Sequence, residues 1–328
     1  MKVLITGGAG FIGSALARYC LDLGHHVSVL DDLSTGRLSN IEVFMSHPQF
    51  RFFEGNCLNS GQVREAAEGS EQIFHLAAVV GVRLVHERSV SAIQTNVLGT
   101  DIVLQEALKI GAKVFIASSS EVYGLGEHGL MSESSQLHLG RTDRPRGAYG
   151  CTKALDEWLA FAYHRERGLS FVIGRFFNTS GPKQSAQYGM VLPRFVRDAL
   201  KGEPLTVYGD GQQTRCFCHV SDVIDAVWRL MQNPYSEGQV YNIAGDQEIT
   251  IEALAHRVIE RSASQSQTIF IPFDEVYGVD AEDPRHRAPS TEKLRRDLSW
   301  TPKRSLNLII DELIEELSTE VDSSTGKG

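Results

Sequence analysis

The sequence lacks several features that would direct it to particular partners or compartments. No segment is apolar for the roughly 20 residues that a membrane-spanning helix needs, and nothing indicates a targeting signal. Positive charge is also in deficit, because 32 lysines and arginines stand against 41 aspartates and glutamates, giving a net charge of -9. This balance argues against nucleic acid or an anionic membrane surface as a partner and favours small molecules.

Cysteine is sparse, and its count is odd. The five cysteines are scattered along the chain, which is typical of reduced thiols in a cytoplasmic protein and not of a disulfide framework. Cys216, Cys218 and His219 have a spacing that suits a metal cluster, but alternate sides of one strand explain it equally well, and no second pair follows. We therefore expect a cytoplasmic protein without a metal.

What the sequence does contain is a regular alternation of apolar runs and helical patterns. With 328 residues, 42% of them hydrophobic, the chain can bury a large core. The runs VLIT, HVSVLDD, QIFHLAA, KVFIASSS and LSFVIGRFF have strand character, and segments with helical spacing separate them. This alternation predicts an α/β fold with a doubly wound parallel sheet and right-handed crossovers.

The pattern changes after about residue 177, where glycine, proline and glutamine become frequent. We expect residues 1–177 to form a dinucleotide-binding domain. Residues 178–317 are expected to form a smaller substrate-binding domain, interleaved with the first because its strands return to the main sheet. The polar end of the chain, residues 318–328, is expected to be a mobile tail.

A glycine-rich turn marks the expected cofactor site. The motif G-x-x-G-x-x-G directly follows the first strand and opens the first helix, so the backbone can approach a pyrophosphate at a helix N-terminus. Asp31 ends the second strand about twenty residues later, where a carboxylate can bind both ribose hydroxyls and would repel a 2′-phosphate. Together they predict a Rossmann-type site for NAD in preference to NADP. The residues of the turn expected to contact NAD are Gly7, Gly10, Phe11, Ile12 and Gly13.

Tyr149 and Lys153 form a Y-x-x-x-K pattern at a predicted helix start, which places the phenol and the ammonium on one helical face. Lys153 and a bound nicotinamide would both stabilise phenolate, so the tyrosine pKa of about 10 is expected to fall towards neutrality. Tyr149 can then act as a base. The pattern gains specificity from the hydroxyl run Ser118, Ser119 and Ser120, which ends the strand one crossover earlier.

Together these motifs resemble the extended short-chain dehydrogenase/reductase superfamily that acts on nucleotide sugars. The shared segments, in order, are TGGAGFIG, HLAA, TNVLGT, the serines, YxxxK, RFFNTSGP and LTVYGDGQQTR. The resemblance implies a Rossmann domain that holds NAD, a smaller domain that holds a UDP-sugar, and a homodimer. It also implies that NAD is contacted by Asn56, Leu76, Ala77, Ala78, Tyr149 and Lys153.

Within this superfamily the segment SSEVYG favours one branch. Ser119, Ser120 and Glu121 resemble the TSEVYG segment of UDP-glucuronate decarboxylases, whereas UDP-glucose 4-epimerases have no acid there and 4,6-dehydratases carry Asp-Glu. EDPRHRAPSTEKL resembles an HRKPS segment of such decarboxylases, whose functional arginine corresponds to Arg287. The resemblance implies catalytic roles for Ser119, Glu121, Tyr149, Lys153 and Arg287, and substrate contacts from Arg83, Ser119, Ser120, Asn178, Val207, Tyr208, Arg215 and Arg287.

The implied reaction begins when Tyr149 takes the proton of the sugar 4-hydroxyl while C4 delivers hydride to NAD. The 4-keto-glucuronate is a β-keto acid and can lose carbon dioxide through an enolate that Tyr149 and Ser119 stabilise, after which hydride return gives a UDP-pentose. Glu121 is expected to disfavour the ground-state carboxylate or to position the water that protonates C5. Arg287 is expected to steady the carboxylate or the diphosphate.

Other functions remain open at this stage. AAVVGVRL, which contains Arg83, resembles UDP-glucuronate 4-epimerases, so a 4-epimerase of UDP-glucuronate or UDP-glucose is the main alternative. A 4,6-dehydratase is disfavoured because Ser120 replaces the acid that would protonate the leaving hydroxyl, and a non-catalytic NAD-binding protein is disfavoured by the intact Tyr149 and Lys153. Glu121 as a structural acid and Arg287 as solvated surface are the alternative interpretations of those two residues.

Overall fold

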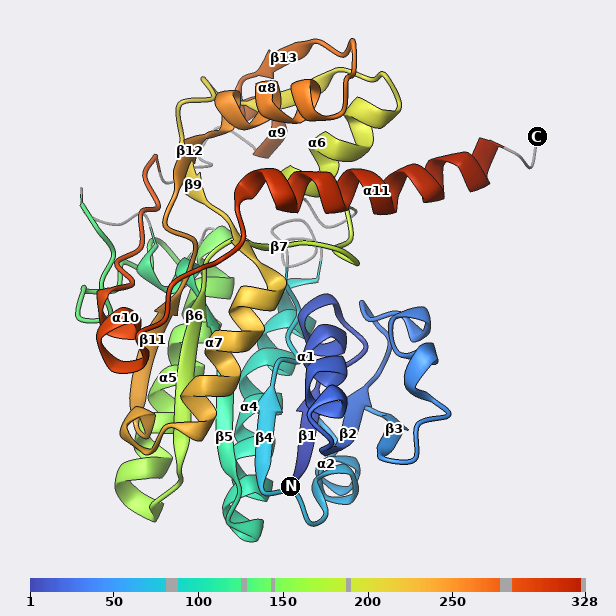
Figure 1. The fold of residues 1–328 in the computed structure, drawn as a ribbon. Coiled ribbons are helices and arrows are strands. Elements are labelled where there is room, and N and C mark those ends of the chain that lie inside the picture. Colours follow the sequence, from blue (N-terminus) through green and yellow to red (C-terminus); the bar gives the residue numbers. More distant parts are fainter. Residues whose placement is uncertain (81–87, 125–128, 143–144, 187–189, 278–284, 326–328) are drawn as a thin grey trace.

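A seven-stranded parallel sheet forms the centre of the molecule (Figure 1). The computed structural model describes residues 1–80, 88–124, 129–142, 145–186, 190–277 and 285–325. The strand order is β11-β6-β5-β4-β1-β2-β3, and every neighbouring pair is parallel. The strands are β1 (Lys2–Thr6), β2 (His26–Asp31), β3 (Phe50–Glu54), β4 (Gln72–His75), β5 (Lys113–Ser119), β6 (Phe171–Phe176) and β11 (Gln239–Ile243). The predicted doubly wound α/β fold is confirmed.

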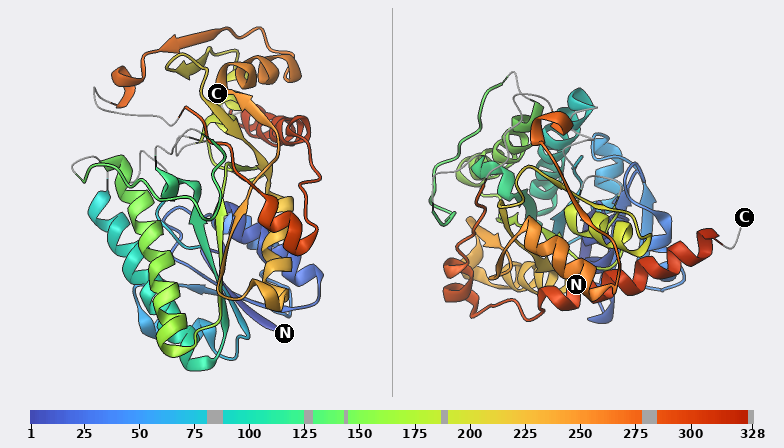
Figure 2. Two further views of the ribbon diagram at one scale, coloured as in Figure 1. Left: turned by 90° about the vertical axis from the view of Figure 1, so that its left-hand side faces the viewer. Right: turned by 90° about the horizontal axis from the view of Figure 1, so that it is seen from above.

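Helices cover both faces of this sheet, and each face has its own core (Figure 2). One face is covered by α1 (Phe11–Asp22), α7 (Val220–Gln232) and α10 (Glu292–Leu298), and the other by α2 (Ser60–Ala67), α4 (Ser89–Ile110) and α5 (Pro145–Arg167). In β1, Val3 and Ile5 pack into the first core and Leu4 into the second. Because both faces are buried, the central strands are continuous apolar runs.

The sequence patterns did not predict β3 and α2. β3 has the sequence FRFFE and lies at the edge of the sheet, where only its first residue is buried. α2 is polar except for a narrow stripe, in which Val63, Ala66 and Ala67 are buried. Elements with so few buried positions give a weak periodic signal.

A second unit lies over the carboxyl ends of the strands (Figure 1). Its core combines α6 (Val191–Leu200), α8 (Ile251–Arg261), α11 (Leu306–Thr325) and β8 (Leu205–Tyr208). Three short strand pairs complete it: β8 with β13 (Thr268–Ile271), β9 (Thr214–Cys216) with β12 (Glu248–Thr250), and β10 (Cys218–His219) with β7 (Thr179–Ser180). The remaining short elements are η1 (Leu38–Asn40), η2 (Glu42–Phe44), η3 (Ser120–Tyr123), η4 (Pro234–Ser236) and α9 (Phe273–Tyr277).

The two units are interleaved along the chain. The chain leaves the sheet after β6, returns as α7 and β11, leaves again for α8, and returns once more as α10. The predicted tail starts within α11, which continues as a helix to Thr325, and Leu317 just before it still packs in the core of the second unit. The boundary drawn at residue 318 therefore does not coincide with a break in the helix. Within the described ranges, no helix is long and apolar enough to cross a membrane.

Candidate active site

The glycine-rich turn lies at the point where the strand order of the sheet reverses. β1 has β2 on one side and β4 on the other, and ligands of doubly wound sheets bind in the crevice at this point. Gly7 has a φ of 71°, and a Cβ there would lie 2.7 Å from the backbone nitrogen of Ala77. A Cβ on Gly13 would lie 2.2 Å from the carbonyl oxygen of Gly7. The turn and the first turn of α1 therefore pack too closely for any side chain at these two positions.

The N-terminus of α1 offers the donors that a pyrophosphate needs. Gly10 is the N-cap, no side chain of the described residues caps the helix, and its first turn contains no acid. The N–H groups of Phe11 and Ile12 belong to the first turn, where no carbonyl within the helix can accept them. These donors and the positive end of the helix dipole suit a diphosphate. The chemistry of the turn therefore fits NAD.

Asp31 ends β2 beside the same turn. Its carboxylate is 8% exposed and accepts hydrogen bonds from the backbone N–H groups of Ala9 and Leu33, each at 2.9 Å. Burial raises the pKa of Asp31, and these two hydrogen bonds oppose that effect. Because the chain itself holds both carboxylate oxygens, Asp31 has a fixed orientation, and the remaining lone pairs can accept from ribose hydroxyls.

The other predicted cofactor residues lie around this crevice. Asn56 donates from its side-chain amide to Asp32 at 2.7 Å, and its Oδ1 accepts from the N–H of Leu58 at 2.8 Å. Its side chain is therefore engaged by the protein. The partly exposed residues that follow β4 are Leu76, Ala77 and Ala78.

His75, in the HLAA segment, is a packed residue. It is 1% exposed, and its two ring nitrogens lie 2.8 Å from the hydroxyl of Thr6 and 3.0 Å from that of Thr100. Burial, with a smaller contribution from the charge of Lys153, lowers the pKa of His75 to about 3. The imidazole is therefore neutral and joins β1, β4 and α4 beneath the site.

Ser119, Glu121 and Tyr149 meet where β5 ends and α5 begins. The Ser119 hydroxyl caps η3 by accepting the N–H of Glu121 at 3.2 Å, and it also forms a hydrogen bond with the Tyr149 phenol. A Cβ on Gly150 would lie 2.5 Å from the Glu121 carbonyl oxygen. The start of α5 is therefore packed against η3, which brings the serine and the tyrosine together.

The protein's own groups raise the pKa of Tyr149. Burial is the largest cause, and Lys153 and the hydrogen bond with Ser119 oppose it, whereas the carboxylates of Glu121 and Asp156 add to it. The expected fall towards neutrality is therefore not produced by Lys153. A fall of the Tyr149 pKa towards neutrality therefore depends on the positive charge that a bound nicotinamide contributes.

Lys153 forms a buried ion pair that the sequence analysis missed. Its ammonium, 2% exposed, lies 3.1 Å from Oδ2 of Asp156, whose side chain is fully buried. Burial lowers the pKa of Lys153, but Asp156 and Tyr149 outweigh it, so the net shift is upward. Lys153 is therefore a cation. The spacing of Lys153 and Asp156 could have predicted this pair, because residues three apart on a helix lie on the same face.

Glu121 and Arg287, which the sequence analysis selected separately, contact each other. The Arg287 guanidinium donates to Oε1 of Glu121 at 2.6 Å across a sequence separation of 166 residues. The Arg287 side chain is 6% exposed and that of Glu121 is 24% exposed. Arg287 is therefore not solvated surface, and the interpretation of Glu121 as a paired acid agrees with this contact. Glu121 also acts electrostatically on Tyr149, so the pair lies near the Tyr149 phenol.

Asn242, at the end of β11, fixes the segment that carries Arg287. Its side-chain amide donates to the carbonyl oxygens of Met131 at 2.9 Å and Ser290 at 3.1 Å. Its Oδ1 accepts from the Tyr123 hydroxyl at 2.8 Å. The N–H of Met131 donates to the carbonyl of Ala288 at 2.8 Å. One buried amide therefore joins the loop of Glu121 to the segment of Arg287.

A second buried ion pair stabilises η3, the segment that carries Glu121. Arg175 of β6 contacts Glu157 of α5 with two hydrogen bonds, at 2.9 and 2.6 Å. Glu157 also accepts from the Ser118 hydroxyl at 2.5 Å, and Arg175 donates to the Tyr123 hydroxyl at 2.8 Å. Because each of these groups has a partner, the network fixes η3 instead of leaving buried charges unpaired.

The predicted sugar and base contacts are spread over the second unit. Asn178 has a φ of 35° and donates to the carbonyl of Cys216 at 3.0 Å, and Arg215 is 9% exposed and donates to the carbonyl of Thr214 at 2.7 Å. The guanidinium of Arg194 covers the ring of Tyr208.

Three predicted substrate contacts remain. Val207 is fully buried in the core of the second unit, so its side chain packs there and does not face a ligand. Ser120 is also buried, at 4% exposure. Arg83 lies outside the described residues.

Comparison with known proteins identifies the family. Residues 3–244 match the model of the NAD dependent epimerase/dehydratase family. The chain belongs to this family. The resemblance drawn from the motifs is thereby confirmed, and the expected cofactor, NAD, is the one in the description of the epimerase/dehydratase family.

Relatives within the epimerase/dehydratase family carry more specific names. The chain is 36% identical over 96% of its length, and 97% of the relative's, to a UDP-N-acetyl-alpha-D-glucosaminuronate decarboxylase of Bacillus cytotoxicus. It is 33% identical over 98% of its length, and 73% of the relative's, to UDP-glucuronic acid decarboxylase 1 of Danio rerio. A solved UDP-glucuronic acid 4-epimerase of Bacillus cereus, in complex with UDP-glucuronic acid and NAD, has a TM-score of 0.88 at 27% identity and covers 98% of this chain and 100% of its own.

Proposed function

We propose that the protein is an NAD-dependent decarboxylase of a UDP-linked uronate, with UDP-glucuronate as substrate and a UDP-pentose as product. The observation that carries this proposal is the ion pair of Glu121 and Arg287 beside Tyr149. It provides a guanidinium that can bind a sugar carboxylate and a carboxylate that can repel it. The two relatives named as uronate decarboxylases support the same substrate class.

The first chemical step assigns roles to Tyr149 and Ser119. When NAD is bound, it accepts the hydride of sugar C4 and later returns it. Tyr149 takes the proton of the 4-hydroxyl, and the Ser119 hydroxyl, which contacts the phenol, holds the same sugar oxygen. Gly7, Gly13 and Asp31 are the residues that would orient the cofactor for this transfer.

The second step uses the pair of Glu121 and Arg287. Oxidation at C4 makes the sugar a β-keto acid, so the bond between C5 and the carboxyl carbon breaks with its electrons moving into an enolate. Tyr149 and Ser119 donate hydrogen bonds to the enolate oxygen. Arg287 orients the carboxylate, Glu121 disfavours its charged ground state, and a proton from water that Glu121 positions then completes C5.

The product of UDP-glucuronate tests this proposal. The protein is incubated with UDP-glucuronate and a catalytic amount of NAD, and the sugar H5 and anomeric signals are followed by proton NMR. Two H5 protons, with carbon dioxide released, are expected for a UDP-pentose. A six-carbon product with inverted C4 would contradict decarboxylation. UDP-N-acetylglucosaminuronate is tested in parallel, because the relative from Bacillus cytotoxicus bears that substrate in its name.

A 4-epimerase of UDP-glucuronate is the second candidate, favoured by the likeness to the Bacillus cereus enzyme. It needs the same Tyr149, Lys153 and NAD, but the 4-keto sugar must rotate before hydride returns. In that case Arg287 would retain the carboxylate instead of promoting its loss. The NMR experiment separates the two functions by the number of carbons in the product.

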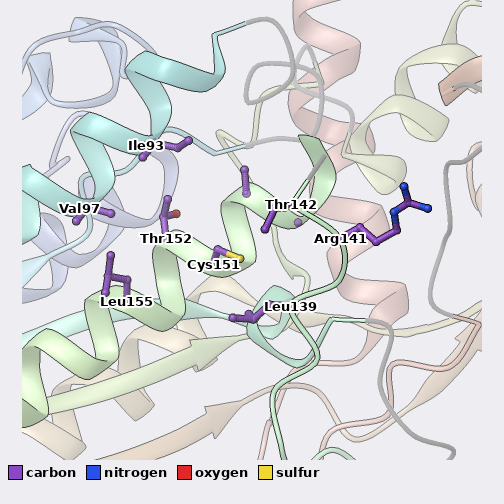
Figure 3. A pocket seen from close by; sticks show the side chains of 10 residues that line it. Ile93, Val97, Leu139, Arg141, Thr142, Cys151, Thr152 and Leu155 are labelled. Carbon is purple, nitrogen blue, oxygen red and sulfur yellow. The ribbon is translucent and has the colours of Figure 1, made fainter. Parts of the chain in front are cut away.

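We further propose that the protein is a homodimer formed through α4 and α5. These helices pack side by side on the sheet, and their outer surface leaves apolar side chains exposed. A pocket of about 250 Å³ between α4, α5 and the loop of Leu139 continues this surface (Figure 3). The exposed residues are Val90, Ile93, Leu98, Leu155, Trp158 and Phe161. A second copy would cover them by a two-fold contact.

Light scattering on purified protein tests the dimer. The parent is expected at twice the chain mass, and Trp158→Glu, which places a charge on the exposed apolar surface, is expected to give a monomer with unchanged circular dichroism. A monomeric parent would contradict the proposal. We also propose a cytoplasmic location, since all five cysteines are unpaired thiols, and fractionation of cells that produce the protein tests it.

A further inference from the structure

We propose that Asp156 is a positioning residue, whose carboxylate holds the Lys153 ammonium and limits how strongly that ammonium favours the phenolate form of Tyr149. The inference rests on the proposed role of Tyr149 as the base that takes the sugar proton. It concerns a carboxylate that the reaction itself does not require. The chemistry of hydride transfer and decarboxylation is complete without it.

The geometry is that of an ion pair inside the protein. Lys153 Nζ lies 3.1 Å from Asp156 Oδ2, and the two side chains are 2% and 0% exposed. Both residues are on α5, three positions apart, so the helix itself sets their separation. With so little contact with water, the charges are screened mainly by one another and not by solvent. The ammonium of Lys153 is therefore held by Asp156, and it also acts electrostatically on Tyr149.

Several charged groups lie near Lys153 and Asp156, and they shift the pKa of Tyr149 in different directions. Lys153 lowers the pKa of Tyr149, whereas Glu121 of η3 and Asp156 raise it. Glu157, the next residue of α5, raises the pKa of Lys153, but it is itself paired with Arg175 of β6.

One more titratable group lies near the pair, and Glu121 has a partner of its own. His75 of β4 is neutral and contributes no charge. Glu121 is paired with Arg287. Among the described residues, Asp156 is the carboxylate that contacts Lys153 directly, and its charge raises the pKa of Tyr149, as that of Glu121 also does.

A reason for this arrangement follows from the two roles of Tyr149. The phenol must accept a proton from the 4-hydroxyl, and it must later give a proton back when hydride returns to C4. A group that performs both transfers is most effective when its proton affinity is intermediate. A buried Lys153 without a counter-ion would favour the phenolate strongly and make proton return slow. Asp156 offsets part of that effect.

The experiment replaces the carboxylate by its amide and follows the tyrosine directly. Tyrosinate absorbance is recorded after stopped-flow jumps to alkaline pH with NAD present, and the contribution of Tyr149 is the part that Tyr149→Phe removes. Asp156→Asn is expected to shift this titration to lower pH by about one unit, the size produced by one charge at several ångströms in a protein interior. The acidic limb of the kcat profile is expected to move by the same amount.

Control variants separate this role from a structural one. Asp156→Glu keeps the charge and is expected to titrate within a few tenths of a unit of the parent. Asp101→Asn removes a carboxylate that contacts α5 further along, at Tyr163, and is expected to leave the titration unchanged. If Asp156→Asn does not fold, the smaller neutral Asp156→Ser carries the same expectation.

A purely structural residue would alter the stability of the protein but not the pKa of Tyr149. If the Tyr149 titration of a folded Asp156→Asn protein is unchanged or shifts to higher pH, the inference is wrong. The tyrosinate signal needs no sugar. A shifted titration without any turnover of UDP-glucuronate would therefore leave the positioning role standing and reject the proposed substrate instead.

Discussion

The cofactor side and the substrate side of this site are built in different ways. The predicted cofactor side consists mainly of backbone, with the Asp31 carboxylate beside it: in the turn between β1 and α1, close contacts exclude side chains at Gly7 and Gly13. The substrate side is a set of side-chain pairs that join distant parts of the chain, above all Glu121 with Arg287. A backbone site permits little variation, whereas a site of paired side chains can change its ligand through a few substitutions. This difference agrees with a family that is described as NAD dependent and that includes both epimerases and dehydratases.

The largest expected effect is a loss of NAD affinity caused by a substitution in the glycine-rich turn. In Gly13→Ala the new Cβ would lie 2.2 Å from the Gly7 carbonyl oxygen, so the turn and α1 must separate. Overpacking of this kind costs about 1–3 kcal/mol, and because the displaced groups are those proposed to bind the pyrophosphate, we expect NAD affinity to fall by roughly 100-fold. Calorimetric titration with NAD measures it. Gly61→Ala, within α2, is the matched control, and NAD affinity within twofold of the parent in Gly13→Ala would contradict the expectation.

The second prediction concerns a substitution that is expected to affect the substrate side and not the cofactor side. Arg287→Met removes the partner of Glu121 but touches none of the residues of the glycine turn. We expect kcat/KM for UDP-glucuronate to fall by roughly 30-fold, a loss typical of a truncated buried charge pair, with NAD affinity unchanged. Steady-state kinetics and the NAD titration are compared in one protein. Arg285→Met, two residues away and exposed, is the control, and equal losses in both variants would argue against a specific role.

These two sides also differ in how far the sequence predicts them. The glycine turn, Asp31 and the Y-x-x-x-K pair were recognisable because their spacing is set by one strand, one turn or one helix. Glu121 and Arg287 were selected by resemblance, but their contact was not predicted, because only the tertiary fold brings residues 166 positions apart together. The edge strand β3 and the polar helix α2 were missed for lack of buried positions. Asn242 was missed because a buried asparagine in a strand carries no pattern.

The third prediction concerns the link between the two parts of the substrate side. Asn242→Ala leaves the Tyr123 hydroxyl and the carbonyls of Met131 and Ser290 without their partner. We expect the free energy of unfolding to fall by about 1–3 kcal/mol and KM for UDP-glucuronate to rise, since the Arg287 segment loses its anchor. Urea denaturation and kinetics measure the two effects. Asn233→Ala, which loses a local cap at η4, is expected to leave KM unchanged.

The last prediction is a pH dependence of stability that arises near the predicted cofactor site. The pKa of His75 is about 3 in the folded protein and about 6.5 in an unfolded chain. Because the unfolded chain binds the proton first, stability is complete above the unfolded value and falls as the pH drops from about 6.5 towards 3, by about 1.4 kcal/mol for each unit.

Acidification therefore distinguishes His75 from an ordinary surface histidine. Unfolding free energies of the parent and His75→Gln are measured at several pH values, and the gap between them should narrow as the pH falls. His256→Gln, at an exposed position, is the control and should track the parent throughout. A constant gap between the parent and His75→Gln would contradict the assignment.

The place of β11 in the sheet has a consequence for synthesis of the chain. β11 is an edge strand that pairs with β6, although 62 residues separate the end of one from the start of the other along the chain. A nascent chain that has emerged only as far as β6 already carries the glycine turn, Tyr149 and Lys153. It leaves the β6 edge open to pairing with other chains until β11 arrives. Arg287 emerges later still, so the residues of the predicted cofactor site are all synthesised before the chain can form the pair of Glu121 and Arg287.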